Sequence, residues 1–224
     1  LFGAVVMGDP FFLVGRNPNP GFHLRDLAQM TLGTVSEVPT PWWTLQDDIR
    51  QAGIDPGAIK RVTDQPMTAN AEAVATGTLD VAQLFEPLVS QMETAGTGHV
   101  WHAQASRGPT SYTAFYARTD VISARRAAME AMVRGLARTL RWFAAASPQE
   151  IVTCIADFFP GGDAALMARS IARYKSVKLW TEAPHFPPEA LAQLERGMLS
   201  AGAIKRTPGF AGLVAEDVTE SALG

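Results

Sequence analysis

Short apolar runs rich in β-forming residues alternate along this chain with segments of helical periodicity. Runs of the first kind occupy residues 11–14, 32–35, 79–85, 100–103 and 112–117. Such alternation is typical of βαβ units, in which strands form a largely parallel sheet with helices on its faces. We therefore expect an α/β fold.

The helix expected over residues 41–52 has the clearest start and end signals. Thr40 suits the N-cap and Pro41 the first helical position. Gly53 and Pro56 follow, and they end the helix. Four apolar side chains recur at helical spacing on one face: Trp42, Leu45, Ile49 and Ala52.

The C-terminal half of the chain is expected to be mostly helical. A long amphipathic helix covers about residues 124–146. Shorter helices are capped by Ser147-Pro148, opened by Asp163 and started by Pro188. The tail from Pro208 onward is small and polar, so we expect it to be loosely held. The apolar stripe of the long helix is predicted to consist of Ala128, Met132, Leu136, Leu140 and Phe143.

Charge and hydropathy exclude several classes of function. A net charge of -3 and a pI of about 5.8 provide no basic field for neutralising phosphates, so nucleic acid is not an expected partner. No apolar run approaches the ~18 residues that a membrane span needs. The first residues also lack the basic flank and cleavage site of a signal peptide.

Residues that support catalysis or metal binding are sparse. The single cysteine, Cys154, excludes an internal disulfide, and its apolar neighbours predict a buried, inert thiol. His99 and His102 lie three apart in a predicted strand, which would send their side chains to opposite faces. No nucleophile elbow, P-loop or dinucleotide glycine fingerprint is present. We therefore expect no catalytic residue, no metal site and no cofactor.

The polar loop before the helix at residues 41–52 is the first candidate for a binding site. Backbone N–H groups at a helix start lack intrahelical partners and carry partial positive charge, so they suit an anionic or strongly accepting ligand group. Ser36, Thr40 and the amide of Trp43 are the candidate contacts. The alternative is that Ser36 and Thr40 only cap the helix.

Glu37 complicates an anion site in this loop. Its carboxylate would itself satisfy the helix dipole and repel a nitrate or sulfonate. It would instead accept hydrogen bonds from an amine or an aminopyrimidine. A solvated loop acid is the alternative interpretation of Glu37.

Further candidate contacts lie on two strand connections that we expect to cross between lobes. Phe11 lies on the first connection. Tyr112 ends the second, where it follows the polar residues Thr110 and Ser111. Trp43 points away from the apolar face of its helix and would wall a pocket. For each aromatic residue, plain packing is an equally good interpretation.

Four segments, in this order, resemble a known protein family. They are residues 12–16 (Phe-Leu-Val-Gly-Arg), 36–42 (Ser-Glu-Val-Pro-Thr-Pro-Trp), 77–87 (with Gly-Thr-Leu-Asp-Val and Phe-Glu-Pro) and 107–112 (Arg-Gly-Pro-Thr-Ser-Tyr). Their order and spacing are similar to those of periplasmic solute-binding proteins of ABC importers for nitrate, sulfonate, taurine and thiamine-pyrimidine precursors. The likeness covers most of residues 11–180.

The resemblance implies a type II periplasmic-binding-protein fold, with two α/β lobes, crossing strands and a ligand in the interlobe cleft. It places the end of lobe 1 and the first crossing in residues 1–16, and lobe 2 in residues 17–104. Residues 105–224 then form the return crossing and the C-terminal part of lobe 1. Because the family's first lobe normally opens with several further strands and helices, we expect lobe 1 to be incomplete in this chain.

By the same resemblance, the expected function is capture of a small polar organic molecule or oxyanion for import. The expected partner is an ABC permease in the membrane, the location is the periplasm, and the full-length protein is expected to be a monomer. Two alternatives are a ligand-sensing module and an enzyme like the thiamine-pyrimidine synthase, whose cysteine- and histidine-rich motif Cys154 alone cannot supply. The expected ligand contacts are Ser36, Glu37, Thr40, Trp43, Thr110, Ser111, Tyr112 and Phe11.

Overall fold

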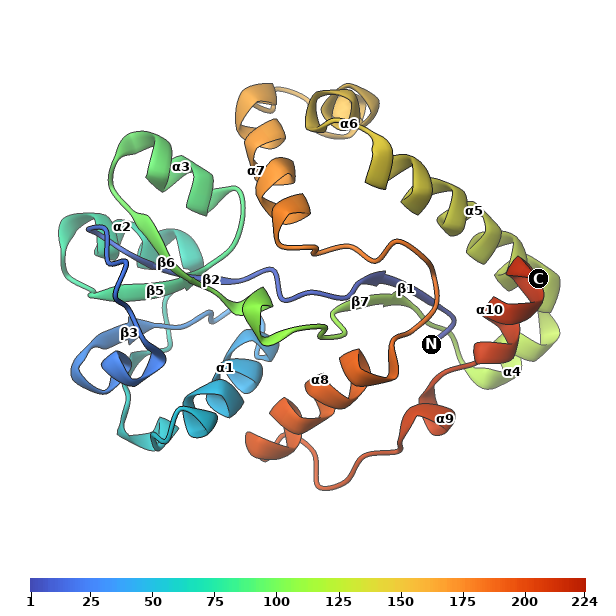
Figure 1. The fold of residues 1–224 in the computed structure, drawn as a ribbon, viewed down its shortest axis with the longest axis horizontal. Coiled ribbons are helices and arrows are strands. Elements are labelled where there is room, and N and C mark those ends of the chain that lie inside the picture. The colour runs from blue at the N-terminus through green and yellow to red at the C-terminus, as the bar shows by residue number, and fades with distance from the viewer. The chain divides into compact units, whose positions relative to one another are not determined.

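Two β-sheets organise the chain, one in each of the two units into which it packs (Figure 1). The computed structural model describes residues 1–224. Unit 1 comprises Leu1–Asp9, Gly108–Glu195 and Arg206–Gly224, and unit 2 comprises Pro10–Arg107 and Arg196–Lys205. The sequence predicts somewhat different boundaries, with lobe 2 at residues 17–104, and these lobe boundaries remain a prediction.

Unit 2 is built on a five-stranded sheet in the order β4-β3-β5-β2-β6. β3 runs parallel to β4 and β5, whereas β2 runs antiparallel to β5 and β6. The α/β fold is confirmed, but the sheet is mixed rather than largely parallel, because apolar runs carry no information on strand direction. The strands are β2 (Phe12–Gly15), β3 (Thr31–Gly33), β4 (Lys60–Val62), β5 (Val81–Leu84) and β6 (His99–Ala103).

Helices cover both faces of this sheet, with α1 on one face and α2 and α3 on the other (Figure 1). On the α1 face, the fully buried side chains of Leu13, Leu32 and Val81 pack with Leu45 and Ile49 of α1. The helical elements of this sheet domain are η1 (Leu24–Gln29), α1 (Thr40–Gln51), η2 (Pro56–Ala58), α2 (Met67–Thr76), α3 (Leu88–Ala95) and η3 (Gln104–Arg107).

A β-bulge in β6 changes which side chains face α1. Leu13 of β2 pairs with His102, whereas the next residue, Val14, pairs with Val100. Trp101 is therefore the extra residue of the bulge, and the ladder resumes on either side of it. The bulge shifts the alternation of β6 by one position.

The bulge also overturns an expectation about the histidines. Residues paired across an antiparallel ladder point to the same face, as do residues two apart on one strand. His102 pairs with Leu13 and His99 with Gly15, so both imidazoles lie on the face that α1 covers. The prediction of opposite faces was wrong because it assumed an unbroken strand.

Gly15 is required by the close approach of Trp101. A Cβ atom at Gly15 would fall inside the indole ring of Trp101. The indole is held in place by a hydrogen bond from its Nε1 to the carbonyl oxygen of Asn17 (2.7 Å). It also contacts the ring of Phe22, with the two centroids 5.3 Å apart. These two contacts hold the indole over Gly15.

Unit 1 contains a two-stranded antiparallel sheet and several helices. The segment at residues 179–184 runs along β1, where the N–H groups of Met7 and Gly8 donate to the carbonyl oxygen of Leu179. The elements are β1 (Gly3–Val6), β7 (Thr113–Phe115), α4 (Thr119–Ala124), α5 (Arg126–Ala145), α6 (Pro148–Ile155), η4 (Ala156–Phe158), α7 (Ala164–Ser176), α8 (Pro188–Ser200), α9 (Phe210–Leu213) and α10 (Glu216–Leu223). α8 begins in unit 1, and its last residues belong to unit 2. None of the helices is both long and apolar enough to cross a bilayer.

The buried face of α5 differs from the predicted stripe. Its buried residues are Met129, Val133, Ala137 and Leu140, whereas Met132 is 44% exposed. Only Leu140 is common to both sets. Because the helix is rich in alanine and methionine, its sequence offers two overlapping apolar stripes, and tertiary packing selects one. α10 makes that selection, since its Val218 packs in one cluster with Met129 and Val133.

Two other expectations for this half of the chain are wrong. Cys154 is exposed rather than buried, because α6 turns Ile151 and Val152 inward and leaves the cysteine on the outer face. The tail after Pro208 is ordered as α9 and α10, and Val218 and Ala222 of α10 are buried. The predicted cap of α6 is confirmed, since Ser147 Oγ accepts the N–H of Glu150 at 3.2 Å.

The Trp101 contact generates a stability prediction. Gly15→Ala is expected to lower the free energy of unfolding by about 1–3 kcal/mol, because the added methyl overpacks the site against an indole that is held in place. The matched control is Gly135→Ala in α5, where an added Cβ meets nothing within 4 Å. That change is expected to raise the free energy of unfolding by about 0.5–1 kcal/mol. Urea unfolding followed by circular dichroism measures both, and a Gly15→Ala protein as stable as the wild type would contradict the prediction.

Candidate functional site

The start of α1 is left without a side-chain cap. Pro39 occupies the N-cap position and makes no side-chain hydrogen bond to the helix. The expectation that Thr40 is the N-cap is therefore wrong, since Thr40 is already the first helical residue. The amide of Trp43 donates to the carbonyl oxygen of Pro39 at 3.1 Å, so it belongs to the helix ladder. The first-turn N–H groups of Thr40 and Trp42 have no preceding helical carbonyl to bond, and they are the donors left at this end.

A buried glutamine holds the first turn of α1 in place. Gln83, on β5, donates from Nε2 to the carbonyl oxygen of Pro41 at 2.8 Å and to Oε1 of Gln104 at 2.7 Å. Both glutamines are fully buried. Oε1 of Gln83 has no hydrogen-bond partner in the protein, which is unusual for a buried acceptor. Sequence reasoning missed this pair, although a glutamine inside the apolar run of residues 81–84 was a usable signal.

A buried ion pair ties η3 to α1. Nε of Arg107 donates to both carboxylate oxygens of Asp48, at 3.0 and 2.9 Å, and the Arg107 Nη2 atom also contacts the carboxylate. The two side chains are only 6% and 8% exposed. Because breaking a buried pair leaves an uncompensated charge, this contact fixes the segment that also carries Gln104. Neither residue was among the predicted site residues.

Glu37 is committed to the protein's own N–H groups. One carboxylate oxygen accepts the backbone N–H of Ser36 (3.1 Å) and the Ser36 hydroxyl (3.3 Å). The other accepts the N–H of Met67, the first residue of α2, at 2.9 Å. Desolvation acts to raise the pKa of Glu37, but the hydrogen bonds from Met67 and Ser36 outweigh it and hold the pKa below its ordinary value. Glu37 therefore caps α2 and shapes the loop.

The predicted contacts near residues 110–112 are hydrogen-bonded within unit 1. The amide of Tyr112 donates to the carbonyl oxygen of Val6, the last residue of β1, at 3.0 Å, and the amide of Thr110 donates to that of Met7 at 2.9 Å. The Ser111 amide donates to the carbonyl oxygen of Ala190 at 2.9 Å. The hydroxyl of Tyr112 donates to the buried carboxylate of Asp9 at 2.8 Å. Sequence reasoning missed Asp9.

Phe11, another predicted contact, is packed inside unit 2. It is 5% exposed, and its ring packs on Phe85 with the centroids 5.3 Å apart. The structure thus brings Ser36, Glu37, Thr40 and Trp43 together in one loop and helix start. A common ligand site that joins them with Phe11 and residues 110–112 stays a prediction.

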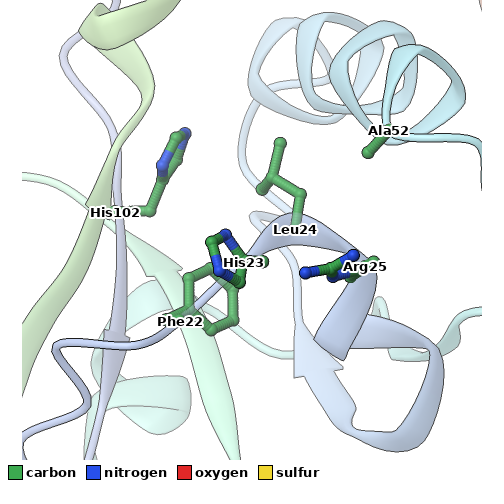
Figure 2. Close-up of a pocket in the computed structure, with 6 residues that line it drawn as sticks. All are labelled: Phe22, His23, Leu24, Arg25, Ala52 and His102. Carbon is green, nitrogen blue, oxygen red and sulfur yellow. The ribbon is translucent and has the colours of Figure 1, made fainter.

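A separate pocket of about 480 Å³ opens elsewhere in unit 2 (Figure 2). None of the predicted site residues lines it. Its lining consists of Phe22, His23, Leu24, Arg25, Ala52 and His102. No group of three or more histidine, cysteine, aspartate or glutamate side chains lies close enough together to hold a metal ion anywhere in the chain.

Known proteins share this fold. The protein YtlA of Bacillus subtilis (strain 168) is 24% identical over 221 residues, which cover 98% of this chain and 66% of that protein. The chain therefore spans just under two thirds of that relative's length.

Solved structures with this fold include both binding proteins and an enzyme. The periplasmic aliphatic sulphonate binding protein SsuA of Escherichia coli matches with a TM-score of 0.69 at 16% identity, over 91% of this chain and 66% of that one. The ligand binding component of an ABC-type import system of Staphylococcus aureus, with zinc bound, matches with a TM-score of 0.68 at 13% identity, over 98% and 73%. The desulfurization enzyme DSZB matches with a TM-score of 0.61 at 13% identity, over 100% and 78%.

The sequence itself carries the family assignment. The NMT1-like family matches residues 22–156, a stretch that includes β3, β4, β5 and β6 of the unit 2 sheet and continues through α5 and α6. Because this match spans more than half of the chain, the chain belongs to the NMT1-like family.

Proposed function

We propose that this chain is part of the solute-binding component of an ABC-type importer, and that it holds an anionic group of its solute at the start of α1. The observation that carries this proposal is the uncapped helix start, where first-turn N–H groups face a polar loop with no side-chain acceptor of their own. The summed helix dipole adds about half a positive charge at this end. Solute-binding proteins among the structures with this fold support the assignment to import.

The solute class follows from the groups around the helix start. A sulfonate, nitrate or carboxylate oxygen suits the N–H groups of Thr40 and Trp42. Glu37 is committed to Ser36 and Met67, but its negative charge stays in the same loop and favours a solute that also carries an amine or another donor. Small organic oxyanions with a donor group, such as taurine, therefore fit better than nitrate. An aminopyrimidine would use Glu37 and leave the N–H groups of the helix start unused.

Gln83 is proposed as a positioning residue. Its Nε2 binds the carbonyl oxygen of Pro41, inside the first turn, so the amide fixes the direction of the N–H groups beside it. The importer assignment brings further proposals with it: a periplasmic location, an ABC permease as the membrane partner and a monomeric full-length protein. The set of proposed contacts is completed by Ser36, Trp43, Phe11, Thr110, Ser111 and Tyr112.

Thr40→Asp is expected to weaken the binding of anionic solutes. A carboxylate in the first turn occupies the helix N–H groups and repels a bound anion, and it favours the fold by about 0.3–1 kcal/mol. Repulsion of about 1–4 kcal/mol at close range weakens binding at least fivefold. Thr40→Asn, which has the same shape without the charge, is expected to keep binding. Thermal shift with taurine, methanesulfonate and nitrate measures this, and a Thr40→Asp protein with the wild-type response would contradict the site.

Glu37→Gln is expected to reduce stability in a pH-dependent way. The depressed pKa of Glu37 means that its carboxylate stabilises the fold above the unfolded-state pKa of roughly 4.3, and that this effect disappears as pH falls through the lower folded-state pKa. At pH 7 the free energy of unfolding of the variant should be lower by roughly 0.5 kcal/mol. This is the low end of the range for loss of a helix cap, because the site is exposed.

The pH profile separates this capping role from other effects of the Glu37 substitution. The stability difference between wild type and Glu37→Gln should close below about pH 4. Glu72→Gln, on the exposed side of α2, makes the same charge change without a capping contact and should show little difference at any pH. A Glu37→Gln effect that is constant from pH 3 to pH 7 would exclude the carboxylate as its cause.

Catalysis is the second candidate function, and the shared fold of DSZB is the observation that favours it. The only cysteine, Cys154, lies exposed on α6 of unit 1, whereas the start of α1 belongs to unit 2. We expect any solute that stabilises the protein to be recovered unchanged after long incubation, as measured by mass spectrometry. A modified product made by the wild type but not by a heat-inactivated sample would establish the enzyme instead.

A further inference from the structure

Every ionisable side chain that lines the pocket of Figure 2 is basic. Three of its residues carry basic side chains, His23, Arg25 and His102, and the others are apolar or small. No carboxylate lines it. The imidazole of His102 comes from β6, and the figure shows it across the opening from His23 and Leu24. A cavity of about 480 Å³ lies within the usual range for small-molecule sites.

The bulge in β6 is what brings His102 to this pocket. With unbroken alternation, the residue after Trp101 would point to the face that carries α2 and α3. The extra residue instead places both Trp101 and His102 on the α1 face. Trp101 then packs on Phe22, whose backbone leads directly into His23. One backbone irregularity thus aligns the strand histidine with the loop histidine.

Charges of both signs lie near the pocket, but those that line it are basic. The Asp26 carboxylate, on the same 3-10 helix as Arg25, accepts the backbone N–H of His23 at 2.8 Å and is not part of the lining. α1 ends at Ala52, which places a partial negative charge of about 0.5 near the pocket. The full positive charge of Arg25, which lines the pocket, exceeds this partial charge. Arg50, in the last turn of α1, bonds Ser200 and adds a further cation at that helix end.

We propose that this pocket is a second anion site, which binds a small organic anion with its charged group on Arg25, His23 and His102 and its apolar part against Phe22 and Leu24. The guanidinium offers the fork of donors that matches a carboxylate, and the imidazoles add two further donors. Hydrophobic contact with Phe22 and Leu24 strengthens the binding of an anion that carries an aryl or alkyl group, and an inorganic ion lacks such a group.

This site is distinct from the one at the start of α1. The pocket meets α1 at Ala52, just after its last helical residue, whereas the uncapped N–H groups lie at its first residue, Thr40. Twelve residues of helix span about 18 Å. An anion at one end therefore does not touch the residues at the other, and this inference does not depend on the proposed solute site.

Histidine NMR provides a direct test with benzoate as the probe. The chain has four histidines, of which His23 and His102 line the pocket and His99 and His185 do not. Benzoate is expected to shift the imidazole C–H resonances of His23 and His102 saturably, and to leave that of His185 unchanged. Benzamide, the neutral counterpart, should cause no saturable shift. Sulfate should bind more weakly than benzoate, because it gains nothing from Phe22 and Leu24.

Variants show which groups bind the anion. Arg25→Gln is expected to weaken benzoate about tenfold, as loss of a charge-assisted contact does. Arg61→Gln removes the same charge from a guanidinium that covers Trp42, outside the pocket, and should leave the affinity within about twofold. Thr40→Asp should also keep the benzoate shifts, which separates a failure here from a failure of the proposed solute site.

Three outcomes would overturn the proposal. The first is the absence of saturable shifts at His23 and His102, and the second is equal weakening of benzoate by Arg25→Gln and Arg61→Gln. The third is benzamide binding as tightly as benzoate, which would make the pocket an apolar site without charge recognition. Shifts at both pocket histidines that need the benzoate charge and Arg25 would support it.

Discussion

The interior position of β2, between β5 and β6, is the constraint on which unit 2 depends. Its four residues are fully or nearly fully buried, and the strand is hydrogen-bonded on both sides, to β5 and to β6. A strand in this position must fill both faces of the sheet and must satisfy every backbone group. Its last residue has to be glycine, because the bulge in β6 lays Trp101 over it. The core on the α1 face and the placement of His102 both follow from this strand and its bulge.

Buried polar groups then attach η3 to that core. Gln104 meets Gln83 of the sheet, and Arg107, three residues later, meets Asp48 of α1. Interactions of this kind add little net stability, because burying the charges offsets much of the gain from pairing them. They do impose one geometry, since any other placement of η3 would leave a charge or an amide buried without a partner. The start of α1, which Gln83 also contacts, is therefore held by polar groups that sequence reasoning did not select.

The sequence predicts the order of the helices and strands better than it predicts which of their side chains pack together. Local signals succeed where they act alone: Ser147 caps α6, Asp163 caps α7, and apolar spacing identifies Leu45 and Ile49 as buried residues of α1, although Ala52 of the same predicted stripe is exposed. Local signals fail where a segment distant in the sequence determines which side chains are buried or which face they occupy. α10 selects which stripe of α5 is buried, and a bulge that no local pattern announces turns His102 to the face of His99. The predicted loop of Ser36 to Thr40 does form the start of α1, but Glu37 bonds α2 because Met67 arrives from 30 residues away.

The two ends of α1 illustrate how one helix would support the two proposed sites, which differ in construction. At its start the helix itself supplies the positive charge, through N–H groups that no side chain caps, so a bound anion meets backbone donors. At its end the helix is negative, and an anion can approach only because the protein has placed cations there, from η1, the loop before it and β6. The first site therefore depends on helix geometry and should tolerate side-chain changes that keep the N–H groups open. The second depends on side chains, and in particular on a bulge that a single deletion in β6 would remove.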